Sequence, residues 1–270
     1  ASAKGKLWLA RQAKVRPGLD TKILCSWNAL MIRGLAMAAR ILDEPEYLTA
    51  AQRAVDFIRE QLWVNQRLFA SWQEGAAKLT GYLDDYVLLM DALLELLQTQ
   101  WRDEDYRFLI GLAESVLHNF EDTAAGGFFF TAHDHESLIH RAKPYYDSVM
   151  PSGNGIAAKV FGRLGHLAAE PRYLTCARRA LQSAWPAVQA QPQAHHNLLL
   201  ALDEVLSSPA QVLLNGDPQM ADWQRQIYAS FGERVHCYWI PPGSEFHPPE
   251  VMALEANQGL VCVGEQCLLA

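Results

Sequence analysis

Apolar residues recur at helical spacing in three pairs of segments over the first 190 residues of the chain. The first member of each pair, at 27–42, 83–99 and 154–168, is apolar nearly all round, which predicts a buried helix. The second member carries charged residues on one side, which predicts a helix facing solvent. The pattern therefore predicts a mainly α fold of αα-hairpins with an inner and an outer layer.

A local repeat supports this pairing. Each outer segment opens with acidic residues and a tyrosine, namely Tyr47, Tyr106 or Tyr173, and acids and prolines suit a first helical turn. Asn28 precedes Tyr47 by 19 residues, and Asn154 precedes Tyr173 by the same number. Equal spacing predicts that equivalent residues lie at equivalent heights in neighbouring hairpins.

Short β-segments are expected between the hairpins. Residues 67–72 alternate like a strand, and residues 126–131 and 137–141, separated by a polar turn, predict a β-hairpin. After a last helix from Pro192 to about Ser207, strand-like segments at 211–215 and 235–240 flank a helical segment at 217–231, and a third strand follows at 259–263. We expect a helical domain over 1–208 and a small βαβ appendix over 209–270.

Stacked hairpins form either an open solenoid or a closed (α/α) toroid. In both, the inner helices run parallel, so their N-terminal ends gather on one face. Free backbone N–H groups and helix dipoles there favour anionic or polyol ligands.

Composition narrows the possible classes of protein. The chain has 270 residues, of which 50% are hydrophobic and 20% charged, and this excludes disorder. With a net charge of −7, the chain has no surplus of positive charge to bind nucleic acid or an anionic membrane. No transmembrane or signal segment is evident, and the missing initiator Met suggests processing or excision from a longer chain. Five scattered cysteines form no disulfide framework and favour a reducing cytoplasm.

The polar residues near the inner-helix starts are the candidate site. Asp84 and Asp85 are the candidate catalytic acids, because paired carboxylates perform sugar hydrolysis. Helix capping is the competing interpretation, although one cap needs only one carboxylate. Arg141 and Lys143, followed by Asp147, place alternate charges on one strand face, which indicates either a cationic clamp that faces the ligand or a solvated strand edge. The candidate substrate-binding residues are Asp20, Lys22, Trp27, Asn28, Tyr86, Arg141, Lys143, Tyr146, Asp147, Ser152 and Asn154.

No cofactor or metal is expected. His133, His135 and Glu136 lack a further ligand at standard spacing, and Cys262 and Cys267 have no second pair for zinc. The sequence contains no phosphate-binding loop or dinucleotide fingerprint.

Four motifs in order resemble the YyaL-like proteins, which are related to a mammalian spermatogenesis-associated thioredoxin-domain protein. The motifs are residues 20–32, Gly81-Tyr-Leu-Asp-Asp-Tyr-Val, 126–131 and 141–155, and the ending from Val261 to Cys267 is also similar. The resemblance implies an N-terminal thioredoxin-like domain, absent here, followed by a helical region similar to the (α/α)6 toroid of sugar epimerases and glycosidases.

The resemblance also implies that this chain is the C-terminal part of such a protein and holds about half of a toroid. The missing hairpins, or a second copy, would then cover its inner helices. Two functions follow as hypotheses. One is a carbohydrate-active domain with acids at the mouth of the helical array; the other is a non-catalytic scaffold for a thioredoxin-like domain or another protein.

Overall fold

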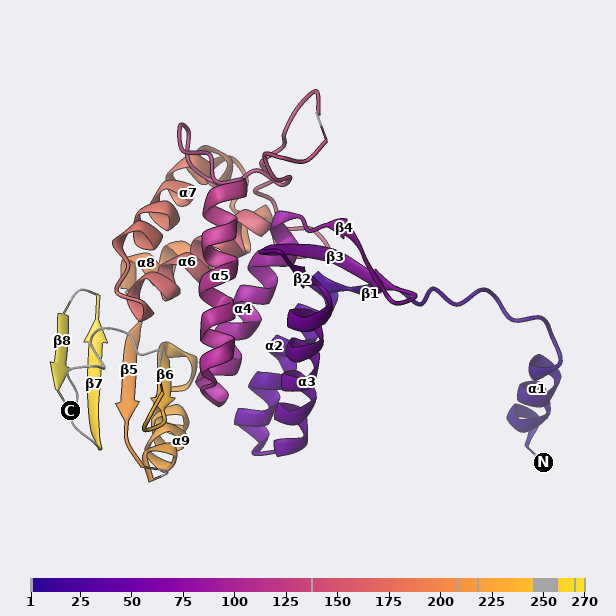
Figure 1. The fold of residues 1–270 in the computed structure, drawn as a ribbon, viewed down its shortest axis with the longest axis horizontal. Helices are drawn as coiled ribbons and strands as arrows, with labels where there is room; N and C mark the ends of the chain where they lie inside the picture. Colours follow the sequence, from indigo (N-terminus) through magenta and orange to yellow (C-terminus); the bar gives the residue numbers. More distant parts are fainter. Residues whose placement is uncertain are drawn as a thin grey trace.

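The computed structural model describes residues 2–136, 138–207, 209–217, 219–244, 257–264 and 266–269. Three αα-hairpins form its body (Figure 1): α2 (Cys25–Leu42) with α3 (Pro45–Gln61), α4 (Leu83–Thr99) with α5 (Asp103–Phe120), and α6 (Gly153–Leu167) with α7 (Pro171–Ala190). A fourth inner helix, α8 (His196–Ser207), follows. The predicted mainly α fold of hairpin repeats is confirmed.

The hairpin turns follow from local chemistry. Asp43 ends α2 in the left-handed conformation at φ 56°, and Ala169 does the same after α6 at φ 49°. Pro45 and Pro171 then begin the outer helices, where a missing N–H costs nothing. These turns reverse the chain within a few residues and place each outer helix against its inner partner.

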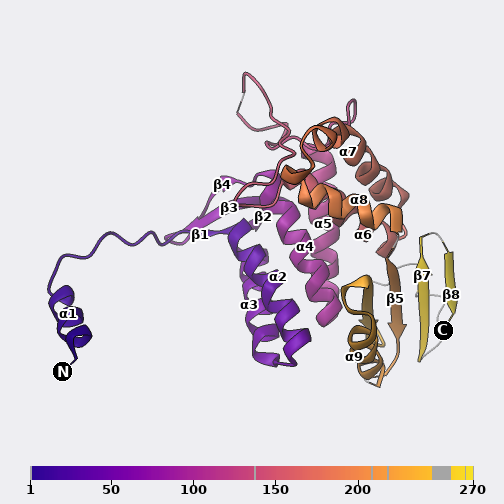
Figure 2. The ribbon, with the colours of Figure 1, turned by 180° about the vertical axis from the view of Figure 1, so that it is seen from behind.

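The inner layer is built around α4. All its residues from Asp85 to Gln98 are buried, because α2 packs on one side of it and α6 on the other, with α5 behind. The inner helices α2, α4, α6 and α8 therefore form an arc, and the outer helices α3, α5 and α7 lie outside it (Figures 1 and 2).

A small sheet closes one end of the first two hairpins. Strand β3 (Arg67–Gln73) pairs with β1 (Ile23–Leu24), β2 (Trp63–Val64) and β4 (Ala76–Thr80), all antiparallel. The register Ile23 to Trp72 holds this sheet at the start of α2. The strand expected at 67–72 is thus present, with three partners that the sequence pattern did not indicate.

The expected β-hairpin over 126–141 is wrong. The described residues there form an irregular loop with one isolated bridge between Glu121 and Phe128, and Ser137 lies outside the described residues. Gly126 and Gly127, at φ 79° and 75°, turn the chain where a strand would need extended backbone. The loop is held instead by single hydrogen bonds, such as that from the N–H of Leu83 to the carbonyl of Phe130.

The C-terminal segment forms a second sheet in the order β6-β5-β7-β8. Strands β5 (Ala210–Asn215) and β6 (Val235–Ile240) are parallel and joined through α9 (Gln219–Phe231), which confirms the βαβ unit. Strand β7 (Gln258–Val263) is antiparallel to β5, and β8 (Gln266–Leu269) was not expected. Cys262 and Cys267 face each other across β7 and β8 and form a disulfide, contrary to the expectation from cysteine spacing.

This second sheet packs onto the inner helices. Tyr238 of β6 is fully buried and meets Trp101 edge-on, and Gln224 of α9 donates to the carbonyl of Gln98 at the end of α4. The appendix therefore covers part of the apolar surface that half a toroid would leave open. The proposed division between 208 and 209 stays a prediction.

Two features lie outside the packed body. Helix α1 (Ala3–Gln12), which was not predicted, lies apart at the end of an extended segment (Figures 1 and 2). On α2, Trp27, Met31 and Ile41 are each more than half exposed and form an apolar stripe along the helix. Among the described residues, no helix has the length and apolar character needed to span a membrane.

Candidate functional site

The N-terminal ends of the inner helices gather on one face, as the repeat spacing predicts. Asn28 lies in the first turn of α2, Asp84 and Asp85 in that of α4, and Asn154 in that of α6. Strand β1 ties the start of α2 to β3, and Phe130 of the 126–141 loop is bonded to the start of α4. We call this end of the arc, with its four helix starts, the mouth.

Asp85 is a helix cap that joins two helices. Its Oδ2 accepts from the N–H of Tyr82 at 3.0 Å, at the start of its own helix, and its Oδ1 accepts from the N–H of Ser26 in α2 at 3.1 Å. Burial raises the pKa of Asp85, although these two hydrogen bonds oppose the shift. Both oxygens are therefore occupied by backbone donors.

Asp84 has a different environment although it is the adjacent residue. Its Oδ1 is closed off from water and makes no hydrogen bond within the described part of the chain. That oxygen lies against the backbone of Gly153, where a Cβ would come within 2.2 Å of it. Burial, and then the charge of Asp85, raise the pKa of Asp84 to about 6. Asp84 is thus a partly buried carboxyl between the starts of α4 and α6, with one oxygen closed off and without a hydrogen-bond partner in the described part of the chain.

Asp147 repeats the role of Asp85 for the next pair of inner helices. Its Oδ1 accepts from the N–H of Ser152, the N-cap of α6, at 2.8 Å, and its Oδ2 accepts from the N–H of Asn197 in α8 at 2.9 Å. Burial works against ionisation, but the bonds from Ser152 and Asn197 outweigh it and lower the pKa of Asp147. Asn197 was missed from the sequence; its place at the start of a fourth inner helix was the signal for it.

Several predicted ligand residues have structural partners instead. Asn154 is fully buried; its side-chain amide accepts from the N–H of Phe128 and donates to the carbonyl of the same residue. Tyr86 is fully buried, and its hydroxyl accepts from the N–H of Leu68 at 2.8 Å. Neither side chain is open to a ligand. Ser152 caps α6 by accepting from the N–H of Gly155 at 3.2 Å, which bears out the capping interpretation for that residue.

The two cations of the third motif also hold the loop in place. Lys143 pairs with Asp122 at 2.7 Å and donates to the carbonyl of Gly126, while Arg141 donates to the carbonyl of Thr131 and lies over the ring of Phe129. Their charges are therefore directed into the 122–131 segment. The alternate charges at 141–147 had allowed either a solvated strand edge or a cationic clamp on a ligand, and these contacts fit neither.

Five predicted residues at or before the mouth keep at least part of their side chain exposed. Trp27 and Tyr146 are 63% and 61% exposed. Asn28 is partly buried and donates to the carbonyl of Leu24 at 2.8 Å. Asp20 and Lys22 pair with each other at 3.1 Å on the surface, and the hydrogen bonds from Lys22 lower the pKa of Asp20.

The described residues hold no group of three or more His, Cys, Asp or Glu side chains placed to bind a metal ion. Tyr82, which belongs to the Gly81-Tyr-Leu-Asp-Asp-Tyr-Val motif, stacks on Phe130 with ring centroids 4.9 Å apart and adds an aromatic pair close to Asp84 in the chain.

The chain is similar to proteins much longer than itself. It is 28% identical over 225 residues to an uncharacterised protein of Caenorhabditis elegans, covering 80% of this chain and 31% of that protein. It is 26% identical over 247 residues to spermatogenesis-associated protein 20 of Rattus norvegicus, covering 87% of this chain and 31% of the relative. The predicted resemblance is thereby confirmed, while the chain spans about a third of the length of these relatives. No family model matches it.

Solved structures show the fold. A GH76 α-mannanase of Bacteroides thetaiotaomicron matches with a TM-score of 0.55 at 11% identity, over 91% of this chain and 65% of its own. Cellobiose 2-epimerase of Spirochaeta thermophila matches with a TM-score of 0.52 at 15% identity, over 60% of this chain and 43% of its own. The arc of hairpins is therefore part of an (α/α)6 toroid-like fold.

A third match concerns an inactive variant of an α-1,6-mannanase of Salegentibacter, in complex with α-1,6-mannotetrose. In that variant two consecutive aspartates are replaced by alanine. Its TM-score is 0.50 at 14% identity, over 60% of this chain and 47% of its own.

Proposed function

We propose that the mouth binds a carbohydrate and that Asp84 supplies the acid–base group of an epimerase- or glycosidase-like reaction. The observation that carries the proposal is the carboxyl oxygen of Asp84, which is buried and unpartnered at the convergence of two helix starts. A structural carboxylate in that position would be expected to accept a backbone hydrogen bond, as that of Asp85 does.

The raised pKa suits the chemistry. With a pKa of about 6, Asp84 keeps part of its proton at a pH where an ordinary aspartate has lost it. It can then give that proton to a glycosidic or ring oxygen, and take one back as a base. Asp85, whose oxygens accept from Tyr82 and Ser26, would fix the two helix starts rather than transfer a proton.

Trp27 and Tyr146 would be the stacking surfaces for sugar rings, and Asn28, Asp20 and Lys22 the polar contacts at the edge of the mouth. The matched toroid enzymes act on sugars, and one of them is inactive when two consecutive aspartates are replaced. Asp84 and Asp85 are consecutive, which supports the assignment of the acid to this pair.

Calorimetry with a panel of mono- and oligosaccharides on the full chain tests the proposal. We expect binding of at least one sugar, weakened in Trp27→Ala, and loss of turnover of that sugar in Asp84→Asn. Glu46→Gln, an exposed acid on α3 away from the mouth, is the matched control and should change neither. The proposal is overturned if Trp27→Ala leaves the binding, and Asp84→Asn the turnover, of every sugar that the unaltered chain binds unchanged.

A scaffold function is the second candidate, and the stripe of Trp27, Met31 and Ile41 on α2 favours it. Such a row of exposed apolar side chains is typical of a surface that another segment covers. The cover would be further hairpins of a longer protein, a thioredoxin-like domain or a second copy. Sizing chromatography together with dye binding tests the scaffold function, because a monomer that binds no hydrophobic dye would contradict it.

A further inference from the structure

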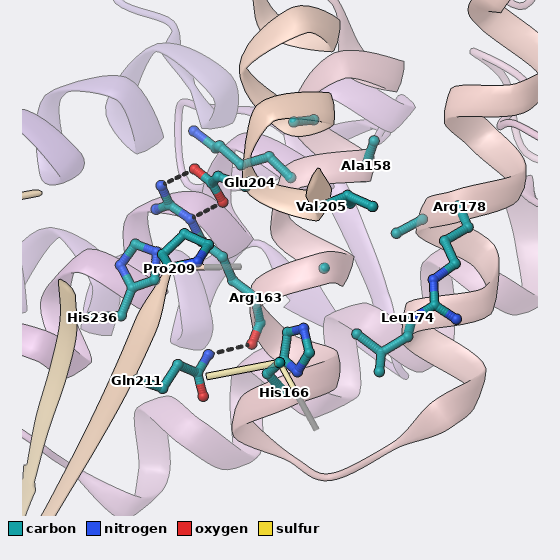
Figure 3. A pocket seen from close by; sticks show the side chains of 15 residues that line it. Ala158, Arg163, His166, Leu174, Arg178, Glu204, Val205, Pro209, Gln211 and His236 are labelled. Atoms are coloured by element: carbon teal, nitrogen blue, oxygen red, sulfur yellow. Dashed lines mark hydrogen bonds and ion pairs between the residues drawn. The ribbon is translucent and has the colours of Figure 1, made fainter. Parts of the chain in front are cut away.

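A second cavity lies away from the mouth, between α6, α7, α8 and the C-terminal sheet (Figure 3). Its lining comes from the middle and end of α6, from Ala158 to His166, whereas the mouth is at the start of that helix. Its volume is about 230 Å³. This is less than the roughly 300–1,000 Å³ of sites for drug-sized ligands, so the cavity suits a small molecule.

The charged side chains of the lining are mainly cationic. Lys159, Arg163 and Arg178 carry positive charge, and Glu204 is the one carboxylate among the described lining residues. This excess stands out in a chain whose net charge is −7. Arg178 is exposed and has no hydrogen-bond or ion-pair partner in the described part of the chain. The cavity therefore favours an anion over a cation or a neutral polyol.

The cationic wall is rigid. Arg163 is forked onto Glu204, with N–O distances of 2.9 and 2.6 Å, and its carbonyl accepts from the side chain of Gln211 at 3.0 Å (Figure 3). Lys159 is held by Asp91 at 2.9 Å. Side chains fixed in this way lose little further conformational entropy when a ligand binds.

Two buried nitrogen atoms of residues that line the cavity have no hydrogen-bond partner in the described part of the chain. One is Nη1 of Arg163, which lies 3.5 Å from a carboxylate oxygen of Glu95 in an ion pair but makes no hydrogen bond. The other is Nε2 of His236, whose residue is only 5% exposed. A buried donor without an acceptor is costly, and an anion that enters the cavity and reaches these nitrogens would supply one.

His236 stays uncharged in these surroundings. Burial, and then the charges of Arg163, Lys159 and Arg40, lower its pKa well below the ordinary value. A neutral imidazole can present an N–H at Nε2 without adding charge. Opposite it, Leu174 and Ala177 of α7, together with Val205 of α8, provide an apolar wall next to the cations.

We infer that this cavity binds a small organic phosphate, with the phosphate group against Arg163 and His236 and the organic part along Leu174, Ala177 and Val205. The fork of Arg163 is occupied by Glu204, but a phosphate group offers several acceptor oxygens to the unpaired Nη1 of Arg163 and Nε2 of His236. The site is separate from the mouth, so it stands whether or not the mouth binds a sugar.

Calorimetry and thermal unfolding of the full chain in phosphate-free, low-salt buffer test the inference, with phenyl phosphate, inorganic phosphate and phenol as probes. We expect phenyl phosphate to bind more tightly than inorganic phosphate and to raise the Tm, and phenol not to bind. Arg178→Gln should weaken the binding of phenyl phosphate about fivefold at low salt. Arg53 is another exposed arginine on an outer helix, so Arg53→Gln is the matched control and should leave the binding unchanged.

His236→Leu separates a binding role from a structural one. It removes an unpaired buried nitrogen, so the Tm without ligand should stay the same or rise, while the affinity for phenyl phosphate falls roughly tenfold or more. Absence of binding by the unaltered chain would overturn the inference, as would equal weakening by Arg53→Gln. Equal affinity for inorganic and phenyl phosphate would overturn the assignment of the apolar wall to an organic group. If His236→Leu does not fold, the comparison of Arg178→Gln with Arg53→Gln decides.

Discussion

The carboxylate of Asp85 accepts a hydrogen bond from the backbone N–H of Ser26, 3.1 Å away, and so joins the first turn of α4 to that of α2. Asp147 joins α6 to α8 in the same manner, through the N–H groups of Ser152 and Asn197. Neighbouring inner helices are thus tied at their N-terminal ends by side chains that replace water at free backbone donors. Asp84 takes no part in these ties.

Replacing Asp85 by Ala should lower the free energy of unfolding by about 2 kcal/mol or more, because the N–H groups of Tyr82 and Ser26 both lose their acceptor. Urea denaturation at neutral pH measures this. Asp84→Asn is the adjacent control, since Asp84 makes no hydrogen bond in the described part of the chain. Equal losses in both variants would contradict the assignment of the ties to Asp85.

Stability should depend on pH through Asp84. Its pKa is raised to about 6 in the folded chain from an ordinary 3.8, so the folded state binds the extra proton between these values. Stability therefore falls as the pH rises from about 4 to about 6, by about 3 kcal/mol at most. Asp84→Asn should remove this component and should be more stable than the unaltered chain at pH 7. Urea denaturation across that range checks it, and parallel curves for the two proteins would refute it.

Gly153 should not tolerate a side chain. A Cβ there would lie 2.2 Å from Oδ1 of Asp84 and 3.0 Å from Leu83, so Gly153→Ala should cost about 1–3 kcal/mol through crowding. Gly162→Ala on the same helix meets nothing within 4 Å and should be neutral or stabilising. Thermal unfolding compares the two. Adding Asp84→Ala to the Gly153 variant should recover part of the loss, and no recovery would place the clash elsewhere.

The cysteines should divide into two classes. Cys262 and Cys267 are bonded across β7 and β8, whereas Cys25, Cys176 and Cys237 are free and buried. Thiol titration of the unfolded chain without reductant should therefore find three thiols, and five after reduction. Five thiols without reductant would instead fit the reducing compartment that the cysteine spacing predicts.

The helical hairpins could be predicted because their signals are local. Apolar spacing, acidic first turns and proline at the start of α3 and α7 act within one or two helical turns, so each helix carries its own evidence. The shared offset from Asn28 to Tyr47 and from Asn154 to Tyr173 likewise placed the inner-helix starts at one end. The βαβ order of the tail followed from the same kind of local pattern.

The roles of the polar residues were decided only by the packing of distant segments. Asp84 and Asp85 are adjacent and chemically identical, yet one is a cap and the other an unpartnered carboxyl, because Ser26 and Gly153 approach them from other helices. Lys143 forms an ion pair with Asp122, and Asn154 is hydrogen-bonded to Phe128. The second cavity forms where β6 places His236 next to α6. The sequence thus determined which residues lie at the helix starts, whereas hydrogen-bond partners, burial and raised pKa values depend on contacts between residues far apart in the chain, which no local pattern encodes.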